Sequence, residues 1–262
     1  MSLSILVSTC SAYKDTWPTL AQGLENIRPD LGADLPVHVV CTNPDDIEHI
    51  PEGWHPIHTQ SDLGWSDNLI RCVESMTSDY ILLWLDDIIP VEVTKPGFLK
   101  SIKEFIGSQK PSYLRLSPKP PSNDLFVVDR AGFEYFKIGN DVPYRNSTIL
   151  ALWHREALLK VLRPGETAWQ FEVNGSRRST GLEFFCLNSA PIKTVNLIVK
   201  GYIEPASMRA ITHAGLPYSG QRLRMPLTTL MRLRTKELVH HILISSLPPA
   251  WFTKLQAIRH NL

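Results

Sequence analysis

The chain has 262 residues, of which 43% are hydrophobic and 20% are charged, and its formal net charge is +1 at pH 7. This composition excludes wholesale disorder, and the near-neutral charge gives no indication of nucleic-acid binding. The charge is unevenly distributed, because residues 221–262 contain seven Lys or Arg side chains and one acid. A basic segment after a mildly acidic body predicts a local anionic partner.

The N-terminal residues lack the charged and apolar regions of a signal peptide. No run approaches the roughly 18 apolar residues that a membrane-spanning helix needs. The four cysteines have no metal-ligand spacing and indicate free thiols. We therefore expect a cytoplasmic protein with reduced cysteines.

The first half of the chain alternates strand-like and helix-like segments. Apolar runs typical of strands occupy residues 3–9, 36–43, 54–60 and 79–87. Apolar residues at helical spacing predict helices over residues 17–27 and 65–76. Strands that alternate with helices predict a parallel α/β sheet, and ligands bind such sheets beyond the carboxyl ends of the strands.

The second half is less regular. We expect a helix over residues 98–107, a strand over 112–118 and a Pro-rich loop over 117–124. A strand that turns into a helix should follow over 147–163, and a late strand over 194–203. The sequence shows no internal repeat and no clear linker, which favours one large domain.

Two adjacent acids, Asp86 and Asp87, end the apolar run at residues 79–87. Like charges repel and desolvation is costly, so such a pair faces water, caps a helix or binds a cation. Carboxylates together with phosphate oxygens are the ligands that Mg²⁺ and Mn²⁺ prefer. The alternative is a solvated turn with an N-capping Asp.

The order of these segments resembles that of GT-A-type nucleotide-sugar glycosyltransferases. Residues 65–90, 144–179 and 196–203 are similar to one bacterial family of that fold, whose members act in lipopolysaccharide or capsular polysaccharide synthesis. The resemblance covers about residues 1–205. It implies an α/β, GT-A-like, Rossmann-type mixed and mainly parallel sheet flanked by helices. The GT-A-like domain would span residues 1–215, followed by a basic amphipathic helical tail at 216–262.

The resemblance also implies a nucleoside site at the ends of the first two strands. Its candidate residues are Thr9, Ser11, Tyr13, Asp15, Thr42, Asn43, Asp45 and Asp67. The alternative for Thr9 and Ser11 is an ordinary role in a turn. Positioned cations stabilise a diphosphate leaving group as its charge grows, which makes Arg177, Arg178 and Lys200 candidates. Their alternative is a solvated basic turn.

The family usually has a metal signature of Asp-any-Asp, whereas Asp86 and Asp87 are adjacent here. Which carboxylate would contact the metal is therefore open. His213 is a candidate third ligand, with an ordinary structural histidine as the alternative. Inverting transfer needs a carboxylate that removes the proton of the acceptor hydroxyl, and the candidates are Glu172 and Glu166. The alternative for Glu166 is an acid that favours the start of a helix.

Two residues are candidates for the acceptor site. Trp169 can stack on a sugar face, or it belongs to the core. Arg115 binds the acceptor, or it forms a structural salt bridge inside an apolar run. The basic tail predicts amphipathic helices on an anionic membrane surface, or packing on the domain or on a second subunit in a homo-oligomer.

Together these features predict a glycosyltransferase with Mn²⁺ or Mg²⁺ as cofactor. It would move a sugar, with inversion, from a nucleotide-diphosphate sugar (a UDP-sugar is favoured) to a glycan or lipid-linked acceptor. Its place would be the cytoplasm or the inner face of the cytoplasmic membrane. The alternative is a catalytically inactive GT-A-like protein that binds sugar or acts as a scaffold. A nucleotidyltransferase is disfavoured, because residues 8–15 lack the glycines of a phosphate loop.

Overall fold

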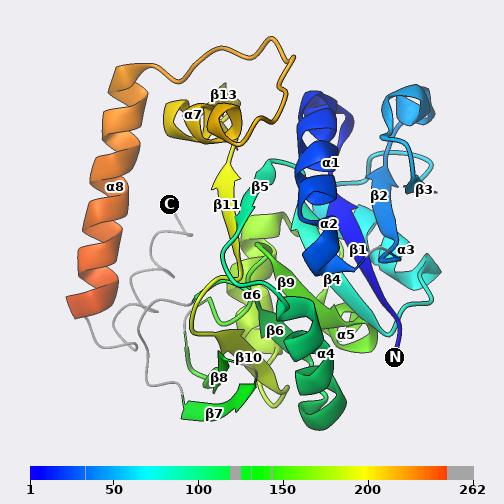
Figure 1. The fold of residues 1–262 in the computed structure, drawn as a ribbon, viewed down its shortest axis with the longest axis vertical. Coiled ribbons are helices and arrows are strands. Elements are labelled where there is room, and N and C mark those ends of the chain that lie inside the picture. Colours follow the sequence, from blue (N-terminus) through cyan, green and yellow to red (C-terminus); the bar gives the residue numbers. More distant parts are fainter. Residues whose placement is uncertain (33, 119–124, 131, 143, 247–262) are drawn as a thin grey trace.

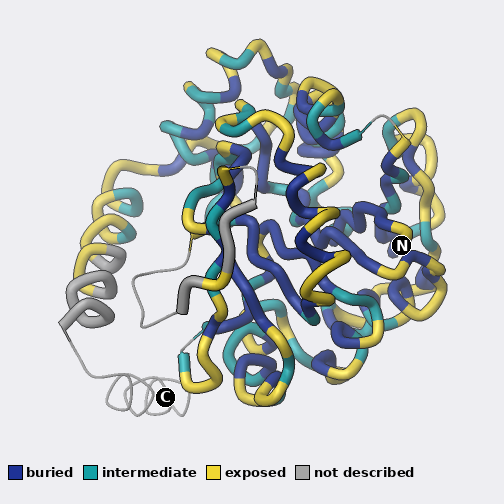
Figure 2. The backbone as a smooth tube through the Cα atoms, turned by 60° about the horizontal axis from the view of Figure 1, so that its bottom comes forward, coloured by how far each residue is buried: buried dark blue, intermediate teal, exposed yellow. Residues whose placement is uncertain are grey.

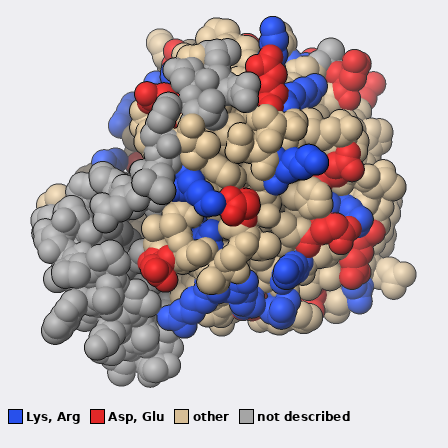
Figure 3. Space-filling model, turned by 90° about the horizontal axis from the view of Figure 1, so that it is seen from below, with Lys and Arg blue, Asp and Glu red and all other residues tan. Residues whose placement is uncertain are grey.

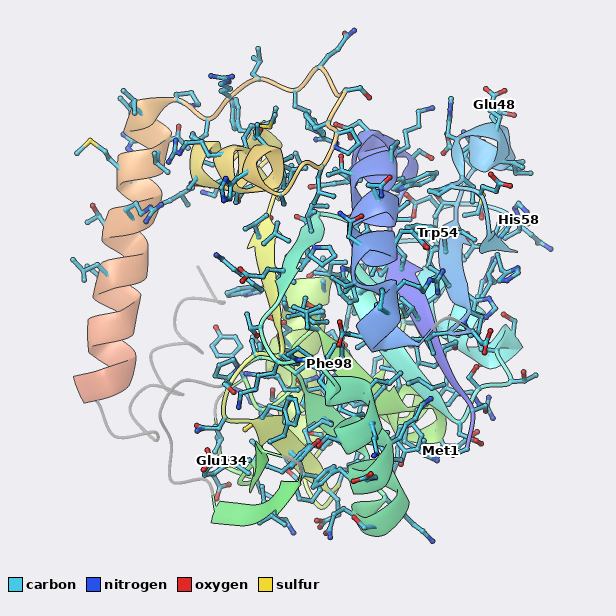
Figure 4. All side chains as sticks on the ribbon, viewed as in Figure 1. Met1, Glu48, Trp54, His58, Phe98 and Glu134 are labelled. Atoms are coloured by element: carbon cyan, nitrogen blue, oxygen red, sulfur yellow. The ribbon has the colours of Figure 1, made fainter. Side chains whose placement is uncertain are left out.

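A nine-stranded sheet forms the centre of the molecule, with the strand order β3-β2-β1-β4-β9-β6-β10-β8-β7 (Figure 1). The computed structural model describes the whole chain except residues 33, 119–124, 131, 143 and 247–262. Figure 4 shows how wide the sheet is, with Trp54 and His58 on β3 at one edge and Glu134 on β8 near the other.

The N-terminal half of the sheet is parallel, as predicted. Its strands are β1 (Leu3–Ser8), β2 (Val37–Cys41), β3 (Trp54–His58) and β4 (Tyr80–Leu85). β1 lies between β2 and β4, so that Ile5 is in register with Val37 on one side and with Leu82 on the other. The carboxyl ends of β1, β2 and β4 therefore lie along one edge.

The other half of the sheet is mixed. Its strands are β6 (Tyr113–Arg115), β7 (Leu125–Arg130), β8 (Phe133–Lys137), β9 (Ala151–His154) and β10 (Phe184–Leu187). β9 is antiparallel to both of its neighbours, β4 and β6, whereas β10 is parallel to β6. Because β9 runs in the opposite direction, the loop that enters it lies at the carboxyl ends of β4 and β6.

Helices cover both faces of the sheet. One layer consists of α1 (Trp17–Asn26), α2 (Arg28–Leu31) and α4 (Phe98–Gln109), which lie in front of the sheet in Figure 1. The other consists of α3 (Trp65–Ser75), α5 (Arg155–Val161) and α6 (Ala168–Arg178). Alternate strand residues serve the two layers, since Ile5 packs in the core with Leu20 of α1 and Leu6 packs in the core with Leu69 of α3. The buried strands lie between exposed helix faces in Figure 2.

Smaller elements extend the sheet edge that carries the strand ends. They are η1 (Ser11–Thr16), η2 (Pro44–His49), β5 (Ile88–Val93), β11 (Ile192–Asn196), β12 (Ile198–Val199), β13 (Tyr202–Ile203) and α7 (Pro205–His213). β5 and β11 form an antiparallel ribbon that leads from β4 toward α7 (Figure 1). The single late strand predicted over residues 194–203 is thus divided into β11, β12 and β13.

The C-terminal part is helical, as predicted, in α8 (Leu227–Ser246), which lies at the side of the molecule in Figure 1. The predicted tail begins at residue 216, but residues 216–225 pack on the main domain, where Leu216 and Met225 are buried. Residues 247–262 of the tail, and most of the predicted Pro-rich loop, lie outside the described residues. None of the described helices is both long and apolar enough to cross a membrane. The face shown in Figure 3 carries acidic and basic side chains side by side.

The packing of α6 gives a stability prediction. A Cβ atom at Gly175 would lie 2.7 Å from Asn146 Nδ2 and 3.0 Å from Val161 Cγ1. Overpacking costs about 1–3 kcal/mol, more than the ~1 kcal/mol that Ala gains over Gly in a helix, so Gly175→Ala should lower the free energy of unfolding. Gly107→Ala in α4 is the matched control, since its Cβ meets nothing within 4 Å, and it should raise this free energy. Urea unfolding of both variants checks the opposite signs.

Candidate functional site

A cavity of about 310 Å³ opens at the carboxyl edge of the parallel strands. Its walls come from the ends of β1 and β4, from η1, and from the starts of α3 and α6. The lining residues include Thr9, Cys10, Tyr13, Asp62, Gly64, Trp65, Asn68, Asp86, Asp87 and Ala168. The cavity therefore lies where ligands bind in sheets of this type.

Asp86 is held at the end of β4 by the end of β1. It is 7% exposed, and its Oδ2 accepts a hydrogen bond from the Thr9 hydroxyl. Thr9 in turn accepts one from Trp17 Nε1 (2.8 Å). Burial, and to a smaller extent the charge of Asp87, raises the pKa of Asp86 to about 8. The alternative of a solvated turn is therefore wrong for Asp86.

Asp87 has different partners, which belong to the β5–β11 ribbon. Its carbonyl accepts from Leu197 N (2.8 Å). The Asn196 amide nitrogen, in the orientation that satisfies both of its partners, donates to Asp87 Oδ2 (3.1 Å) and to Ile198 O (2.7 Å). Burial raises the pKa of Asp87 to about 6. The two adjacent acids are thus fixed by separate elements while both line the cavity.

Both carboxylates line the cavity, and carboxylate oxygens are ligands of the kind that a hard divalent cation prefers. Two carboxylates do not complete the shell of such an ion, so phosphate oxygens and water would supply the rest. His213, predicted as a third ligand, is exposed at the end of α7. In the described part of the chain, no three His, Cys, Asp or Glu side chains are grouped to hold a metal. His213 therefore does not join the pair.

The predicted nucleoside residues between the end of β1 and the end of η1 divide into two groups. Thr9 and Tyr13 line the cavity. Ser11 instead forms a hydrogen bond with Asp46, which also pairs with Lys14 (3.0 Å). Asp15 is bound by Arg222 and Tyr218, so its carboxylate is engaged within the protein and its predicted role as a donor ligand is not supported.

The other predicted nucleoside residues do not line this cavity. Thr42 is buried, and Asn43 caps η2 by accepting from Asp45 N (3.1 Å). Asp67 accepts from Gly165 N (2.6 Å), and Ser66 from Glu166 N (2.8 Å). These bonds attach the turn before α6 to the start of α3. They therefore support the cavity wall without lining the cavity.

Sequence reasoning missed the segment before α3. Asp62 Oδ1 accepts from Asn68 Nδ2 (2.8 Å) and from Gly64 N (3.1 Å), and all three residues line the cavity with Trp65. The available signal was the polar run of residues 60–62 between a strand and a helix. Cys10 also lines the cavity, and it is the one cysteine of the four that is not buried.

The basic candidates for the diphosphate lie elsewhere. Arg178 pairs with Glu166, with Nη1 2.8 Å from Oε1. Arg177 is exposed at the end of α6, and Lys200 is exposed in the β12–β13 turn with a φ of 53°. None of the three lines the cavity, so the structure gives no support to the prediction that they meet the diphosphate there.

The two candidate bases differ in their surroundings. Burial alone would raise the pKa of Glu166, but hydrogen bonds from Arg178 and Asn174 hold it below its usual value, so Glu166 is a poor proton acceptor. Glu172 Oε1 accepts from Thr148 N (2.7 Å), Thr148 Oγ1 (3.0 Å) and Ser147 Oγ (3.0 Å). Among the described residues no hydrogen bond reaches Oε2, so this oxygen is available to take a proton.

Glu172 belongs to the same sheet edge, since Ser147 and Thr148 lie in the loop that enters β9. Trp169, one turn earlier on α6, is 51% exposed, which excludes the core alternative. Its ring centroid lies 5.7 Å from that of Tyr144. Arg115 is 6% exposed and donates to Tyr113 Oη (3.1 Å) and Tyr144 O (2.6 Å). Arg115 thus supports the loop from inside, and the prediction that it contacts an acceptor is wrong.

No protein-family model and no curated protein matches the sequence. Among solved structures, residues 1–349 of TarS from S. aureus are 14% identical, with a TM-score of 0.50 over 73% of this chain and 59% of that one. The same protein in complex with UDP is 13% identical, with a TM-score of 0.51 over 84% and 67%. The chain thus spans less than two thirds of the first of these structures. At this identity the likeness shows that the chain has a GT-A-like fold.

Proposed function

We propose that this chain is a glycosyltransferase that moves a sugar from a nucleotide-diphosphate sugar, with a UDP-sugar favoured, to a hydroxyl group of a glycan or lipid-linked glycan. The observation that carries the proposal is the cavity in which buried Asp86 and half-buried Asp87 meet the end of β1. The fold shared with TarS, which has been solved with UDP, supports the choice of donor.

In this proposal the nucleoside lies against Tyr13 and Thr9, and the diphosphate points toward the acidic pair. Asp86 and Asp87 would hold a Mn²⁺ or Mg²⁺ ion, which neutralises the charge of the diphosphate. The polar residues Asp62 and Asn68, on the opposite wall, would contact the nucleoside from the side of α3.

Transfer would proceed by a single displacement. The acceptor oxygen forms a bond to the anomeric carbon while the bond from that carbon to the diphosphate oxygen breaks. The electron pair of that bond leaves with the nucleoside diphosphate, and Glu172 Oε2 takes the proton of the acceptor hydroxyl. Trp169 would stack on the acceptor sugar, since an exposed indole offers a face to sugar C–H groups. The configuration at the anomeric carbon is then inverted.

A lipid-linked acceptor of this kind would belong to bacterial surface polysaccharide synthesis, so we propose that the enzyme works at the inner face of the cytoplasmic membrane. Its support is the surface of α8, where Leu227 and Met231 are exposed next to the exposed Arg232 and Arg234. Co-sedimentation with anionic vesicles, and its loss in 0.5 M salt, tests this placement; recovery of the protein in the supernatant at low salt contradicts it.

Ligand protection at Cys10 tests the donor site. UDP with Mn²⁺ should slow alkylation of this thiol several-fold, because Cys10 lines the cavity and the other three cysteines are buried. Burial raises the pKa of Cys10, so the assay belongs at about pH 8.5, where more thiolate is present. Mass spectrometry locates the label. ATP at the same concentration is the control, and equal protection by both nucleotides, or by neither, counts against a UDP-sugar site.

A further inference from the structure

The segment that follows α7 passes beside α1 before α8 begins (Figure 1). Its start is attached to α1, since the Thr19 hydroxyl donates to Pro217 O (2.5 Å). Its end is attached to β13, where Ile203 N donates to Leu223 O (3.0 Å) and Met225 N donates to Ile203 O (3.0 Å). The residues between these anchors face η1, which carries Tyr13.

The segment contacts η1 through three side chains, those of Asp15, Tyr218 and Arg222, which we call the Asp15 clasp. Arg222 Nε lies 2.8 Å from Asp15 Oδ2, and Nη2 lies 2.9 Å from Oδ1. Tyr218 Oη donates to the same Oδ2 (2.7 Å). A carboxylate held by both arms of a guanidinium and by a phenol is a strong and directional contact. The side chains of Asp15 and Arg222 are 24% and 19% exposed, so solvent weakens it only in part.

The clasp depends on a close approach of backbone. A Cβ atom at Gly220 would lie 2.6 Å from Asp15 Oδ2 and 2.3 Å from Tyr218 Oη. Only glycine at this position leaves room for the carboxylate and the phenol to meet. The segment is thus built around Asp15.

Arg222 also reaches the cavity wall. Its guanidinium lies over the Tyr13 ring, 4.7 Å from the centroid, and it donates to the Ala12 carbonyl. Tyr13 lines the cavity.

We propose that Arg222 is a positioning residue of the donor site, which orders η1 through Asp15 and holds the Tyr13 ring against the nucleoside of a nucleoside diphosphate. The inference rests on the proposed function and extends it, because it makes donor binding depend on a segment that lies more than 200 residues from η1 in the sequence. A cation–π contact fixes the ring from one side and leaves its other face for the base.

The test compares two arginines of one segment in the full chain. Arg222→Gln should weaken binding of UDP with Mn²⁺ about tenfold or more, the loss expected for a charge-assisted hydrogen bond. Arg224→Gln removes the same charge from an exposed position and should stay within about twofold of wild type. Titration calorimetry measures both affinities. With a UDP-sugar, Arg222→Gln should raise KM and leave kcat nearly unchanged, and Arg222→Lys should restore part of the affinity.

A double-mutant cycle identifies the clasp itself. Asp15→Asn combined with Arg222→Gln should bind UDP as weakly as Arg222→Gln alone, since both changes break one contact. If Arg222→Gln does not fold, Tyr218→Phe removes one hydrogen bond to Asp15 without a change of charge and should weaken UDP binding about two- to threefold.

The outcomes separate this inference from the proposed function. If Arg222→Gln binds UDP as wild type does, or if Arg224→Gln loses as much affinity, the clasp does not position the donor and the proposed function stands. A wild-type chain that binds no UDP with or without Mn²⁺ overturns both.

Discussion

Glu172→Gln should lower the turnover of sugar transfer by about two to four orders of magnitude, the usual contribution of a general base. The affinity for UDP should stay within about twofold of wild type, because Glu172 does not line the donor cavity. The amide oxygen of Gln can still accept the three hydrogen bonds that Ser147 and Thr148 give to Oε1. The loop before β9 therefore keeps its place while Oε2 loses its ability to take a proton. Initial rates at saturating donor and acceptor measure the effect.

Glu166→Gln is the matched control, because it makes the same chemical change six residues earlier. It weakens the ion pair with Arg178, whose side chain is 23% exposed, and should lower the melting temperature more than the turnover. If Glu172→Gln turns over at a rate near wild type, the base lies elsewhere. If both variants lose turnover in proportion to their stability, the effect of Glu172 is structural.

Asp86→Asn and Asp87→Asn should each reduce metal-stimulated turnover by about 100-fold or more, since a divalent ion supplies several kcal/mol of charge stabilisation in such reactions. Neither change should destabilise the fold, and Asp86→Asn should leave the melting temperature equal to or above that of wild type. The reason is that a buried carboxylate is costly, whereas an amide of the same size carries no charge. Calorimetry with UDP, with and without Mn²⁺, checks the binding step, and a variant that keeps the full response to Mn²⁺ removes that residue from the site.

The binding of a metal ion at Asp86 and Asp87 should depend on pH. The pKa of Asp87 is raised to about 6 and that of Asp86 to about 8, so the pair loses its protons in turn as the pH rises from 5 to 9. A metal ion needs ionised carboxylates, so affinity for Mn²⁺ should increase across this window and level off above it. The metal-free protein should become less stable from about pH 4, where the carboxyls of the unfolded chain ionise, to about pH 8, because over this range the folded state holds protons that the unfolded chain has lost. Asp86→Asn should flatten both profiles.

The first half of the fold is predictable because its signals are local. The strands at β1, β2 and β4 are apolar runs bounded by polar residues, and α3 has regular helical spacing. A parallel order of these strands is enough to place Thr9 and Asp86 at one edge of the sheet. The strand that turns into a helix at β9 and α5 is predictable for the same reason.

The remaining features depend on contacts between distant parts of the chain. Nothing in residues 147–154 shows that β9 runs antiparallel to β4, because strand direction is set by the partner. The bond from Arg222 to Asp15 joins residues that are 207 positions apart. The residues next to Asp15 in the sequence therefore suggest that Asp15 binds the nucleotide, and they do not show that its carboxylate is paired with Arg222. From the sequence alone Glu166 is likewise a candidate base, because its pairing with Arg178 depends on how α6 is placed in the fold.

The reversed direction of β9 has a consequence for how such an enzyme can change. In the proposed function, the donor side of the edge is made by the ends of β1 and β4 and by the starts of α3 and α6, whereas the acceptor side would be made by residues 144–150 and the next turn of α6. Apart from α6, which belongs to both sides, they lie on separate stretches of chain. The loop into β9 can therefore vary in length and composition without a shift in the strands that carry Asp86 and Asp87. If the proposed function holds, a change of acceptor would then require changes in the loop before β9 and on α6, while the strand ends that hold the nucleotide-sugar stay as they are.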